Sequence, residues 1–348
     1  MDALAKLREI SGDRDVDERV ADTIAAAESL VGEDGDLELE RRLVESVASA
    51  PGGLDEVCRH LIDAGGKRIR PVICLLAFRT VRGDPPLPLD LAVCCELLHN
   101  ATLLHDDVID EGDTRRGRPA CRAVWSNAIS ILGGDFLLMR CVELVSERGK
   151  RFMDPFVETI RRLVEGEITQ LGLRGSIATS EEQYFRIVEG KTASLFGWSA
   201  LSGAMAAGAA GAACEAIGEF GRRVGVAFQL VDDALDLTAD SAHTGKTLLA
   251  DIGQGKLTLP VILAAEESPE LRRLLAELVD GGDAPAIARE VSRRVDESGA
   301  LAEVRDRAAR QTGLALDALE RLRRLDGCRP LMVEMLSEMS RRLLDRGR

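Results

Sequence analysis

The sequence is poor in aromatic residues, which make up 3% of its 348 positions and include a single Tyr. Its hydrophobic content of 45% is still enough for a sizeable core, so Leu, Ala, Val and Ile must build it. Such a mixture suits packed helices better than sheets, because strands favour β-branched and aromatic residues. The sequence also lacks runs of alternating strands, 20–50-residue repeats and low-complexity tracts beyond one Ala/Gly segment. We therefore predict an all-α fold.

Positive charge is in deficit as well: 45 Lys and Arg stand against 59 Asp and Glu, for a net charge of −14 at pH 7. Binding of phosphate backbones over a large area needs a basic face, so this balance argues against a nucleic-acid partner. A small anionic substrate remains compatible with it, because a local cluster of Lys and Arg outweighs the global sign.

The eight cysteines include no CxxC pair, and most lie in apolar helical segments, as reduced core residues of a cytosolic protein do. The N-terminus, MDALAKLREI, lacks a basic stretch followed by an apolar run, so we expect no signal peptide and a cytoplasmic location. Residues 195–213 are uncharged over about the length of a membrane span. They are mostly Ala, Gly and Ser, which favours two closely packed core helices joined by a turn.

The chain divides into two parts of different character. Residues 1–50 are polar, acidic and helix-prone, and predict a loosely docked helical extension with GEDGD at 32–36 as a loop. From residue 54 onward, apolar residues recur at helical spacing. Glycine- and proline-rich stops occur at 65–66, 83–86, 112, 172–175 and 281–282, and Pro71 suits a first helical turn. Residues 51–348 are therefore predicted to form one domain of about ten or more helices.

Acidic residues gather in the segment LLHDDVIDEGDTRRG at 103–117. Asp106 and Asp110 are four residues apart, so on a helix they share one face, and Asp107 flanks them. Crowded ionised carboxylates repel one another, and hard oxygen ligands favour Mg²⁺ or Ca²⁺ as the compensating cation. Taken alone, this cluster is equally typical of a solvated helix end.

The same spacing returns in FQLVDDALDL at 228–237, where Asp232, Asp233 and Asp236 share a helical stripe with Gln229. Two such clusters facing each other in a bundle would hold several Mg²⁺ ions. Since Mg²⁺ prefers one or two carboxylates together with substrate phosphates, the repeated motif indicates a diphosphate ligand.

Basic residues surround these motifs in the sequence. GGKRIRP at 65–71 places Lys67, Arg68 and Arg70 after a flexible double glycine, and Arg115 and Arg116 follow the first aspartates. GKT occurs twice, at 190–192 and 245–247, but Phe185 and Asp240 stand where a phosphate-binding P-loop needs Gly. Each cation alone is typical of a solvated surface. Together these Lys and Arg residues carry enough positive charge to bind two diphosphates. One would be held through Mg²⁺ and the other directly by the side chains.

In their order, the blocks GGKRIRP, LLHDDVIDEGDTRRG, GGDFLL, EGEITQL, GKTASLF, FQLVDDALD and GKLTLP resemble the trans-isoprenyl diphosphate synthases, the polyprenyl synthetase family. The resemblance covers about residues 54–348. It implies mostly antiparallel helices around a deep central cavity, and usually a homodimer. It further implies a prenyltransferase that condenses isopentenyl diphosphate head-to-tail with an allylic diphosphate, with loose membrane association during product release.

The resemblance also implies roles for single residues. About three Mg²⁺ ions would bind the allylic diphosphate through Asp106, Asp107, Asp110, Asp232, Asp233 and Asp236. The same diphosphate would contact Arg115, Lys191 and Lys256, with Thr192, Gln229 and Lys246 nearby. Isopentenyl diphosphate would be held by Lys67, Arg70, His99 and Arg116. No side chain resembles a dedicated general base, which fits the family's usual assignment of that role to the departing pyrophosphate.

Product length is expected to depend on the residues before Asp106. In this family a bulky aromatic four or five positions before the first Asp stops chain growth, whereas Thr102 and Ala101 stand here, with Leu98 a turn further back. The segment is also similar to those of long-chain synthases that make quinone side chains, so we predict a long-chain product. Met139 and Trp198 are the alternative residues for the floor of the tunnel.

Three other interpretations remain. A short-chain farnesyl or geranylgeranyl diphosphate synthase is the alternative within the family. A non-catalytic subunit of a heteromeric synthase is the alternative outside enzymes, although such subunits typically lose the aspartates or basic residues that are intact here. A class I terpene cyclase shares one DDxxD motif, but its second metal motif is usually of the Asn/Ser/Glu type and it binds no second diphosphate.

Overall fold

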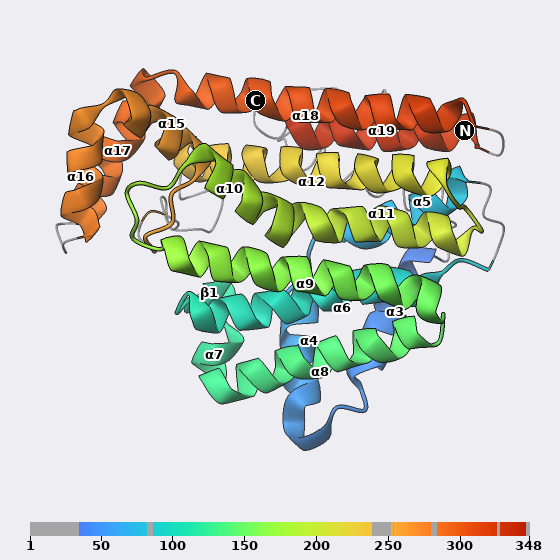
Figure 1. The fold of residues 1–348 in the computed structure, drawn as a ribbon. Helices are drawn as coiled ribbons and strands as arrows, with labels where there is room; N and C mark the ends of the chain where they lie inside the picture. The colour runs from blue at the N-terminus through green and yellow to red at the C-terminus, as the bar shows by residue number, and fades with distance from the viewer. Residues whose placement is uncertain are drawn as a thin grey trace.

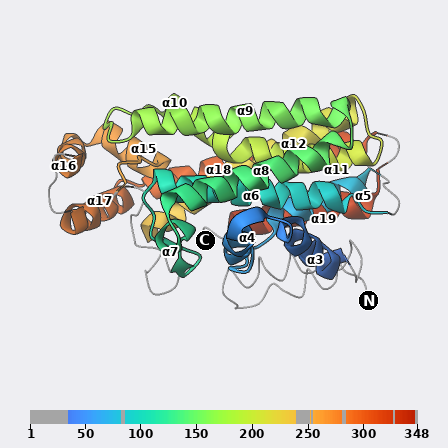
Figure 2. The same ribbon diagram turned by 90° about the horizontal axis from the view of Figure 1, so that it is seen from below.

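Long helices run side by side in this chain and form a bundle (Figures 1 and 2). The computed structural model describes residues 35–81, 86–238, 252, 254–279, 284–325 and 328–345. The α-helices are α3 (Gly35–Val47), α4 (Leu54–Ile62), α5 (Ile69–Thr80), α6 (Leu89–Ile109), α7 (Cys121–Val124), α8 (Asn127–Ser146), α9 (Lys150–Leu173), α10 (Glu181–Val188), α11 (Ser194–Ala206), α12 (Ala212–Thr238), α15 (Leu259–Glu267), α16 (Pro269–Val279), α17 (Ala284–Glu297), α18 (Ala300–Arg323) and α19 (Pro330–Asp345). The predicted all-α fold is confirmed.

Four short elements accompany the α-helices in the described residues. A 3₁₀ turn, η1 (Pro51–Gly53), precedes α4, and a π-helical turn, η2 (Glu189–Ala193), joins α10 to α11. Strands β1 (Thr114–Arg115) and β2 (Arg118–Pro119) pair as a small antiparallel hairpin that the sequence did not predict. A two-residue strand is too short to show an alternating pattern of polar and apolar side chains.

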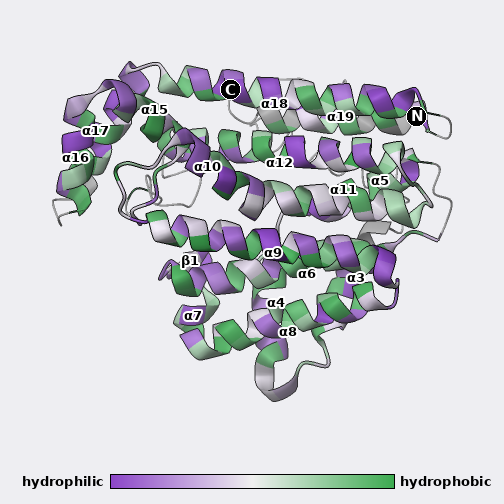
Figure 3. Cartoon of the chain, viewed as in Figure 1, coloured by the Kyte–Doolittle hydropathy of each residue, from purple (hydrophilic) through white to green (hydrophobic). Residues whose placement is uncertain are grey.

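Helix α11 lies near the centre of the bundle and packs against α5, α6 and α12. Almost all of its side chains are buried, and it carries no strongly hydrophilic residue (Figure 3). It ends at Ala206 and α12 begins at Ala212, so the uncharged stretch 195–213 forms parts of two packed helices, as predicted. Among the described residues, no helix is long and apolar enough to cross a membrane.

Most predicted helix ends agree with the structure: α4 ends before Gly65, α6 before Gly112 and α9 just before Gly175. The predicted loop at 32–36 is wrong for its last two residues, since α3 begins at Gly35; residues 32–34 lie outside the described residues. All eight cysteines are free, and six of them are buried.

The described part of the N-terminal extension packs more firmly than its polar composition suggests. Leu39, Leu43 and Val47 recur at helical spacing on α3 and are buried in the main core. The proposed domain boundary at residue 50 remains a prediction.

Arg68 joins three parts of the bundle at the turn between α4 and α5. Its guanidinium group is buried and bonds to Glu40 on α3 (2.7 Å), to Glu96 on α6 (2.8 Å) and to the carbonyl of Ile62 (3.0 Å). The residue adopts a left-handed backbone conformation, with φ of 46°, which is uncommon outside glycine. These bonds fix the turn that carries Lys67 and leads to Arg70.

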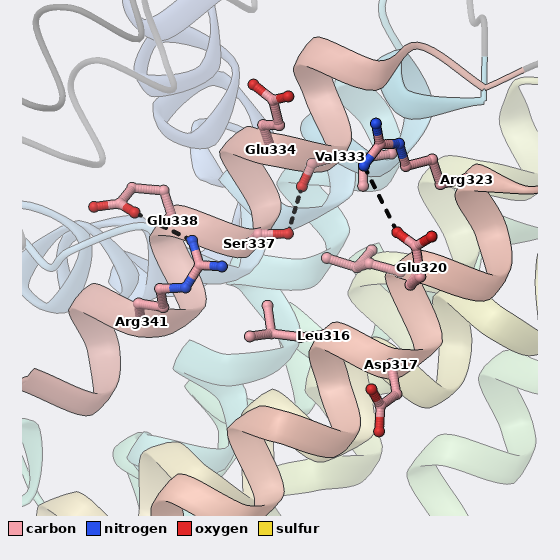
Figure 4. Close-up of a pocket in the computed structure, with 10 residues that line it drawn as sticks. Leu316, Asp317, Glu320, Arg323, Val333, Glu334, Ser337, Glu338 and Arg341 are labelled. Atoms are coloured by element: carbon pink, nitrogen blue, oxygen red, sulfur yellow. Dashed lines mark hydrogen bonds and ion pairs between the residues drawn. The ribbon is translucent and has the colours of Figure 1, made fainter.

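A groove of about 450 Å³ opens between α18 and α19 (Figure 4). Charged side chains that line the groove form ion pairs with one another: Arg323 pairs with Glu320 at 3.7 Å, and Arg341 pairs with Glu338 at 3.5 Å. None of the residues that the sequence predicts for the site lines this groove.

The two partners of Arg68 should differ in their contribution to stability. Glu96 is buried, so Glu96→Gln leaves a buried cation underpaired and is expected to lower the free energy of unfolding by about 3–5 kcal/mol. The Glu40 side chain is 43% exposed, so Glu40→Gln should cost about 1 kcal/mol or less. Urea unfolding of both variants measures the difference, and equal losses would show that burial does not set the strength of these pairs.

Candidate active site

Helices α6, α9 and α12 end at the same end of the bundle, beside the β1–β2 hairpin (Figure 1). The carboxyl end of a helix carries a partial negative charge from its unpaired carbonyl groups. Two of these three ends also carry the aspartate motifs, on α6 and α12. This part of the molecule therefore concentrates negative charge and requires cations.

The first motif divides into one fully buried aspartate and a partly buried pair. Asp107 is buried, and its Oδ1 accepts hydrogen bonds from Nε (2.9 Å) and Nη2 of Arg115. Asp106 and Asp110 are only partly buried and share the other face of α6. Arg174 and Lys256 pair with the two carboxylate oxygens of Asp110, and the Nζ of Lys191 lies 3.9 Å from Asp106.

The ionised form of Asp106 is costly without a bound cation. Burial raises the pKa of Asp106 from its ordinary 3.8 to about 6. Lys191 opposes this rise, whereas the negative charges of Glu167 and Asp110 add to it. A metal ion at this carboxylate would relieve the same electrostatic cost.

The π-helical turn η2 brings Lys191 into this region. Such turns are rare and often occur at functional sites. Here η2 fits against α9 because two glycines meet: a Cβ on Gly190 would lie 2.8 Å from the carbonyl oxygen of Arg162 and 3.0 Å from the Cα of Gly166. Lys191 then donates a hydrogen bond to Gln170 Oε1 (2.7 Å) and pairs with Glu167.

The second motif has the same division. Asp233 is buried and accepts hydrogen bonds from the Tyr184 hydroxyl (2.5 Å) and from Gln229 Nε2 (2.8 Å). Gln229 Oε1 in turn accepts a hydrogen bond from the Thr192 hydroxyl (2.8 Å). Asp232 and Asp236, four residues apart, are partly exposed on α12.

The neighbours Lys191 and Thr192 therefore link the two motifs, since the first lies beside Asp106 and the second reaches Asp233 through Gln229. The sequence analysis missed Tyr184, whose only signal is that it is the sole Tyr of the chain.

A second group of cations gathers where the hairpin meets the α4–α5 turn. Arg116 has φ of 51° and Gly117 has φ of 72°, so both central residues of the hairpin turn are left-handed, as a two-residue turn of this type requires. The Arg116 guanidinium group donates to the carbonyls of Gly65 and Leu61 (3.3 Å to Leu61). Its side chain thereby stabilises an unusual backbone conformation.

Arg70 and His99 face this group. The Arg70 guanidinium carbon lies 4.7 Å from the ring centre of Phe196, and its buried Nε has no hydrogen-bond partner within the described part of the chain. Burial lowers the pKa of Arg70 to about 10, so the side chain remains charged at neutral pH. Burial, followed by the charges of Arg70 and Arg116, holds the pKa of His99 well below its ordinary 6.5, which leaves a neutral imidazole.

The chain thus presents two different binding environments. Asp106, Asp110, Asp232 and Asp236 offer hard carboxylate oxygens that fit Mg²⁺, and the pairing of Asp110 with two cations shows that the site favours positive charge. Among the described residues, no three His, Cys, Asp or Glu side chains converge on one point. Because Mg²⁺ commonly combines one or two carboxylates with substrate phosphates, an ion here would share its coordination with a ligand such as a phosphate. The predicted site residue Lys246 lies outside the described residues.

Comparison with known proteins agrees with this geometry. The sequence profile of the family described as polyprenyl synthetase matches residues 52–294. The chain belongs to the polyprenyl synthetase family. It is 33% identical to the octaprenyl diphosphate synthase of Escherichia coli (strain K12) over 280 residues, which cover 80% of this chain and 87% of the relative.

Two further proteins, one compared by sequence and one by structure, are also similar to this chain. The short chain isoprenyl diphosphate synthase of Methanothermobacter thermautotrophicus is 34% identical over 259 residues, covering 72% of this chain and 80% of the relative. The crystal structure of the polyprenyl synthase of Caulobacter crescentus, complexed with calcium and isoprenyl diphosphate, superposes with a TM-score of 0.86 at 32% identity. That match covers 94% of this chain and 98% of the other. The chain is accordingly a prenyltransferase of the trans-prenyl diphosphate synthase type.

Removal of the Asp106 charge should stabilise the metal-free protein in a pH-dependent manner. Because the folded-state pKa lies above the ordinary value, stability is lost as the pH rises from about 4 to 6 and stays reduced above that. Asp106→Asn is expected to raise the free energy of unfolding at pH 8 by about 1–3 kcal/mol, and to lose this gain near pH 4. Thermal unfolding in the presence of a chelator measures the effect.

The matched control for this substitution is Asp306→Asn, at an exposed position on α18. It should leave stability nearly unchanged at both pH values. An Asp106→Asn protein that is no more stable than the parent at pH 8 would show that this carboxylate is not destabilised by its surroundings.

Proposed function

We propose that this protein is a Mg²⁺-dependent synthase that condenses isopentenyl diphosphate head-to-tail with an allylic diphosphate and releases a long-chain trans-polyprenyl diphosphate. The observation that carries the proposal is the pair of adjacent environments. One is a set of carboxylate pairs that favours positive charge, and the other is a cluster of cations around a neutral histidine. In a reaction between two diphosphate substrates, only one diphosphate group departs. Such a reaction needs both environments.

On the carboxylate side, Asp106 and Asp110 would act with Asp232 and Asp236 to hold Mg²⁺ against the allylic diphosphate. The bound ions would supply a Lewis acid for the departing pyrophosphate. Lys191 and Lys256 already contact the first motif and would neutralise charge that develops on the same phosphates. Asp107 and Asp233, whose oxygens accept hydrogen bonds from the protein, would position these groups.

On the cationic side, Lys67, Arg70, His99 and Arg116 would hold isopentenyl diphosphate, which does not leave. The unpaired Nε of Arg70 is a donor suited to a phosphate oxygen. Because the pKa of His99 is low, its imidazole would donate a hydrogen bond without adding charge. Arg115, bonded to Asp107, lies close enough to His99 to influence that pKa and would separate the two diphosphates.

The reaction balances with these groups. The allylic C–O bond breaks and leaves pyrophosphate, the double bond of isopentenyl diphosphate attacks the allylic cation, and one proton is lost. The departing pyrophosphate would take that proton, because it leaves next to the new cation; among the described residues of the site, no side chain is placed as a dedicated general base.

Activity of the purified chain alone tests this function. Incubation with isopentenyl diphosphate, farnesyl diphosphate and Mg²⁺ should give prenyl products, and Asp236→Ala should lower turnover by several orders of magnitude without loss of helical content, because a metal ligand is removed. Asp317→Ala, at the groove between α18 and α19, serves as the control and should turn over normally. Turnover that appears only after a second chain is added would instead identify a subunit of a heteromeric synthase.

Product length is proposed to depend on α6. Ala101 and Leu98 are buried, and Thr102 donates a hydrogen bond to the carbonyl of His99 (2.8 Å). None of these three α6 residues is aromatic, so the helix itself contributes no bulky ring at these positions. Of the alternative floor residues, Met139 is 45% exposed on α8, whereas Trp198 is buried against Phe156, with ring centres 5.4 Å apart. Trp198 is therefore the stronger of the two alternatives.

Ala101→Phe should shorten the product by several isoprene units at little cost to the first condensation, because the new ring would fill the path of the growing chain. Chain-length analysis of the products measures the change, and Leu314→Phe, at an exposed position on α18, is the control. If Ala101→Phe leaves the product lengths unchanged and Trp198→Ala gives longer products, Trp198 on α11 forms the floor of the tunnel and α6 does not.

The chain is further proposed to act as a homodimer through the outer faces of α8 and α9, which lie side by side (Figures 2 and 3). These faces expose Ile131, Leu132, Met139, Val142, Val157, Val164, Ile168 and Leu171. Nearby charges pair within α9, as Arg161 does with Glu158 and Glu165, so the face offers little net charge to repel a second copy. A two-fold axis would bring the same apolar faces together.

Ile168, which is 65% exposed, is the most exposed of these side chains. Ile168→Asp should convert the dimer to monomers in analytical ultracentrifugation, because the interface would bury unpaired charge. Val279→Asp, at an equally apolar exposed position on α16, should leave the dimer intact. A parent protein that sediments as a monomer would refute the proposal.

A further inference from the structure

The carboxyl end of α6 is held by Arg174, a residue that none of the aspartate or lysine motifs contains. Arg174 is the C-cap residue that directly follows α9. Its Nη2 pairs with Asp110 Oδ1, and its Nη1 donates to the carbonyl of Ile109 (3.1 Å). Lys256 pairs with the other oxygen, Oδ2, of the same Asp110. Both oxygens of this aspartate are therefore bonded to cations of the chain.

The two cations reach Asp110 on segments that are pressed together. The amide of Gly175 donates to the carbonyl of Gly255 (2.8 Å), and both glycines have positive φ values, 75° and 72°. A Cβ on Gly255 would lie 2.9 Å from the Gly175 nitrogen and 3.4 Å from Cγ of Arg174. Only glycine at position 255 permits this approach, so the close contact places Arg174 and Lys256 beside one another.

This arrangement compensates an unfavourable placement of negative charge. Asp110 follows the last turn of α6, where the helix dipole disfavours a carboxylate and favours cations. A metal ion at Asp110 needs the same oxygens that Arg174 and Lys256 occupy. Binding of the ion would therefore release two positive side chains at the place where the oxygens of a diphosphate must arrive.

Arg174 is suited to such an exchange. Its guanidinium group has five N–H donors in a fixed geometry, and one of them is bonded to the carbonyl of Ile109, which is not an oxygen of Asp110. While Nη1 stays bonded to this carbonyl, Nη2 can exchange the carboxylate of Asp110 for a phosphate oxygen. Arginine side chains bind carboxylates and phosphates with similar geometry.

We propose that Arg174 is a further diphosphate-binding residue that exchanges partners: it neutralises Asp110 in the metal-free protein and moves to a phosphate oxygen when a metal ion takes Asp110. The proposal rests on the proposed function for the role of Asp110 as a metal ligand. Arg174 thus competes with the metal in the absence of diphosphate and cooperates with it when diphosphate is present.

The test separates these two effects by calorimetry on the full chain. Mn²⁺ is titrated into the ligand-free protein, and inorganic pyrophosphate is titrated in the presence of Mg²⁺. R174Q is expected to bind Mn²⁺ about threefold to tenfold more tightly, because a competing cation is lost, and to bind pyrophosphate about tenfold more weakly. R174K, which retains the charge, should lie between R174Q and the parent in both titrations.

Arg148 provides a matched control, since it pairs with Asp90 (2.6 Å from Nε) near the other end of α6. R148Q should leave both affinities unchanged. If R174Q binds Mn²⁺ no more tightly than the parent, or binds pyrophosphate equally well, the exchange does not occur. Weaker Mn²⁺ binding by R174Q would also overturn the proposal, because Arg174 would then act only to position Asp110.

Two further measurements keep the outcome unambiguous. D110N should lose Mn²⁺ binding. If it does not, Asp110 is not a metal ligand, and the proposed function is overturned as well. If D110N loses Mn²⁺ binding but R174Q behaves like the parent, only the inference about Arg174 is overturned. Should R174Q fail to fold, the Nε–H signal of Arg174 in the NMR spectrum of the parent protein decides the matter. It should shift when Mg²⁺ and pyrophosphate are added together, and an unmoved signal refutes the exchange.

Discussion

Concentrated negative charge at one end of the bundle is the constraint on which the rest of the site depends. The carboxyl ends of α6, α9 and α12 meet there, and two of them carry aspartate motifs (Figure 1). Such an arrangement is stable only if cations are supplied, and the chain supplies them from separate elements. Lys191 comes from a π-helical turn, while Arg174 and Lys256 come from two loops joined through glycines.

Within each aspartate motif the middle residue is buried, whereas the first and last residues are only partly buried. Asp107 accepts its hydrogen bonds from Arg115, and Asp233 accepts hydrogen bonds from Tyr184 and Gln229. The helical period explains this division, because positions one and five share a face of the helix whereas position two points elsewhere. A motif of three aspartates thus places its carboxylates in two different electrostatic environments.

Much of this organisation was predictable from the sequence, because helical periodicity, glycine stops and the spacing of charged blocks are local properties. The all-α fold and most helix ends followed from them, and the family was recognised by the resemblance of seven ordered motif blocks. What the sequence did not reveal depends on partners distant in the chain. The pairing of Arg174 with Asp110 and of Tyr184 with Asp233 joins residues 64 and 49 positions apart, and neither Arg174 nor Tyr184 lies in a charged block. The small hairpin at Arg116 was missed because its two-residue strands are too short to show an alternating pattern, and the contact of Arg116 with Gly65 joins residues distant in the chain.

The buried cation Arg68 has a consequence for how members of such a family diverge. The region shared with the family begins at residue 52, yet one of the two carboxylates that neutralise Arg68 is Glu40, on a helix that precedes it. Lys67 is the adjacent residue and Arg70 follows two positions later, so the charge of the leading segment affects the electrostatic potential around these two cations. A chimera that exchanges only the leading segment between two relatives would therefore also exchange one of the charges that neutralise Arg68.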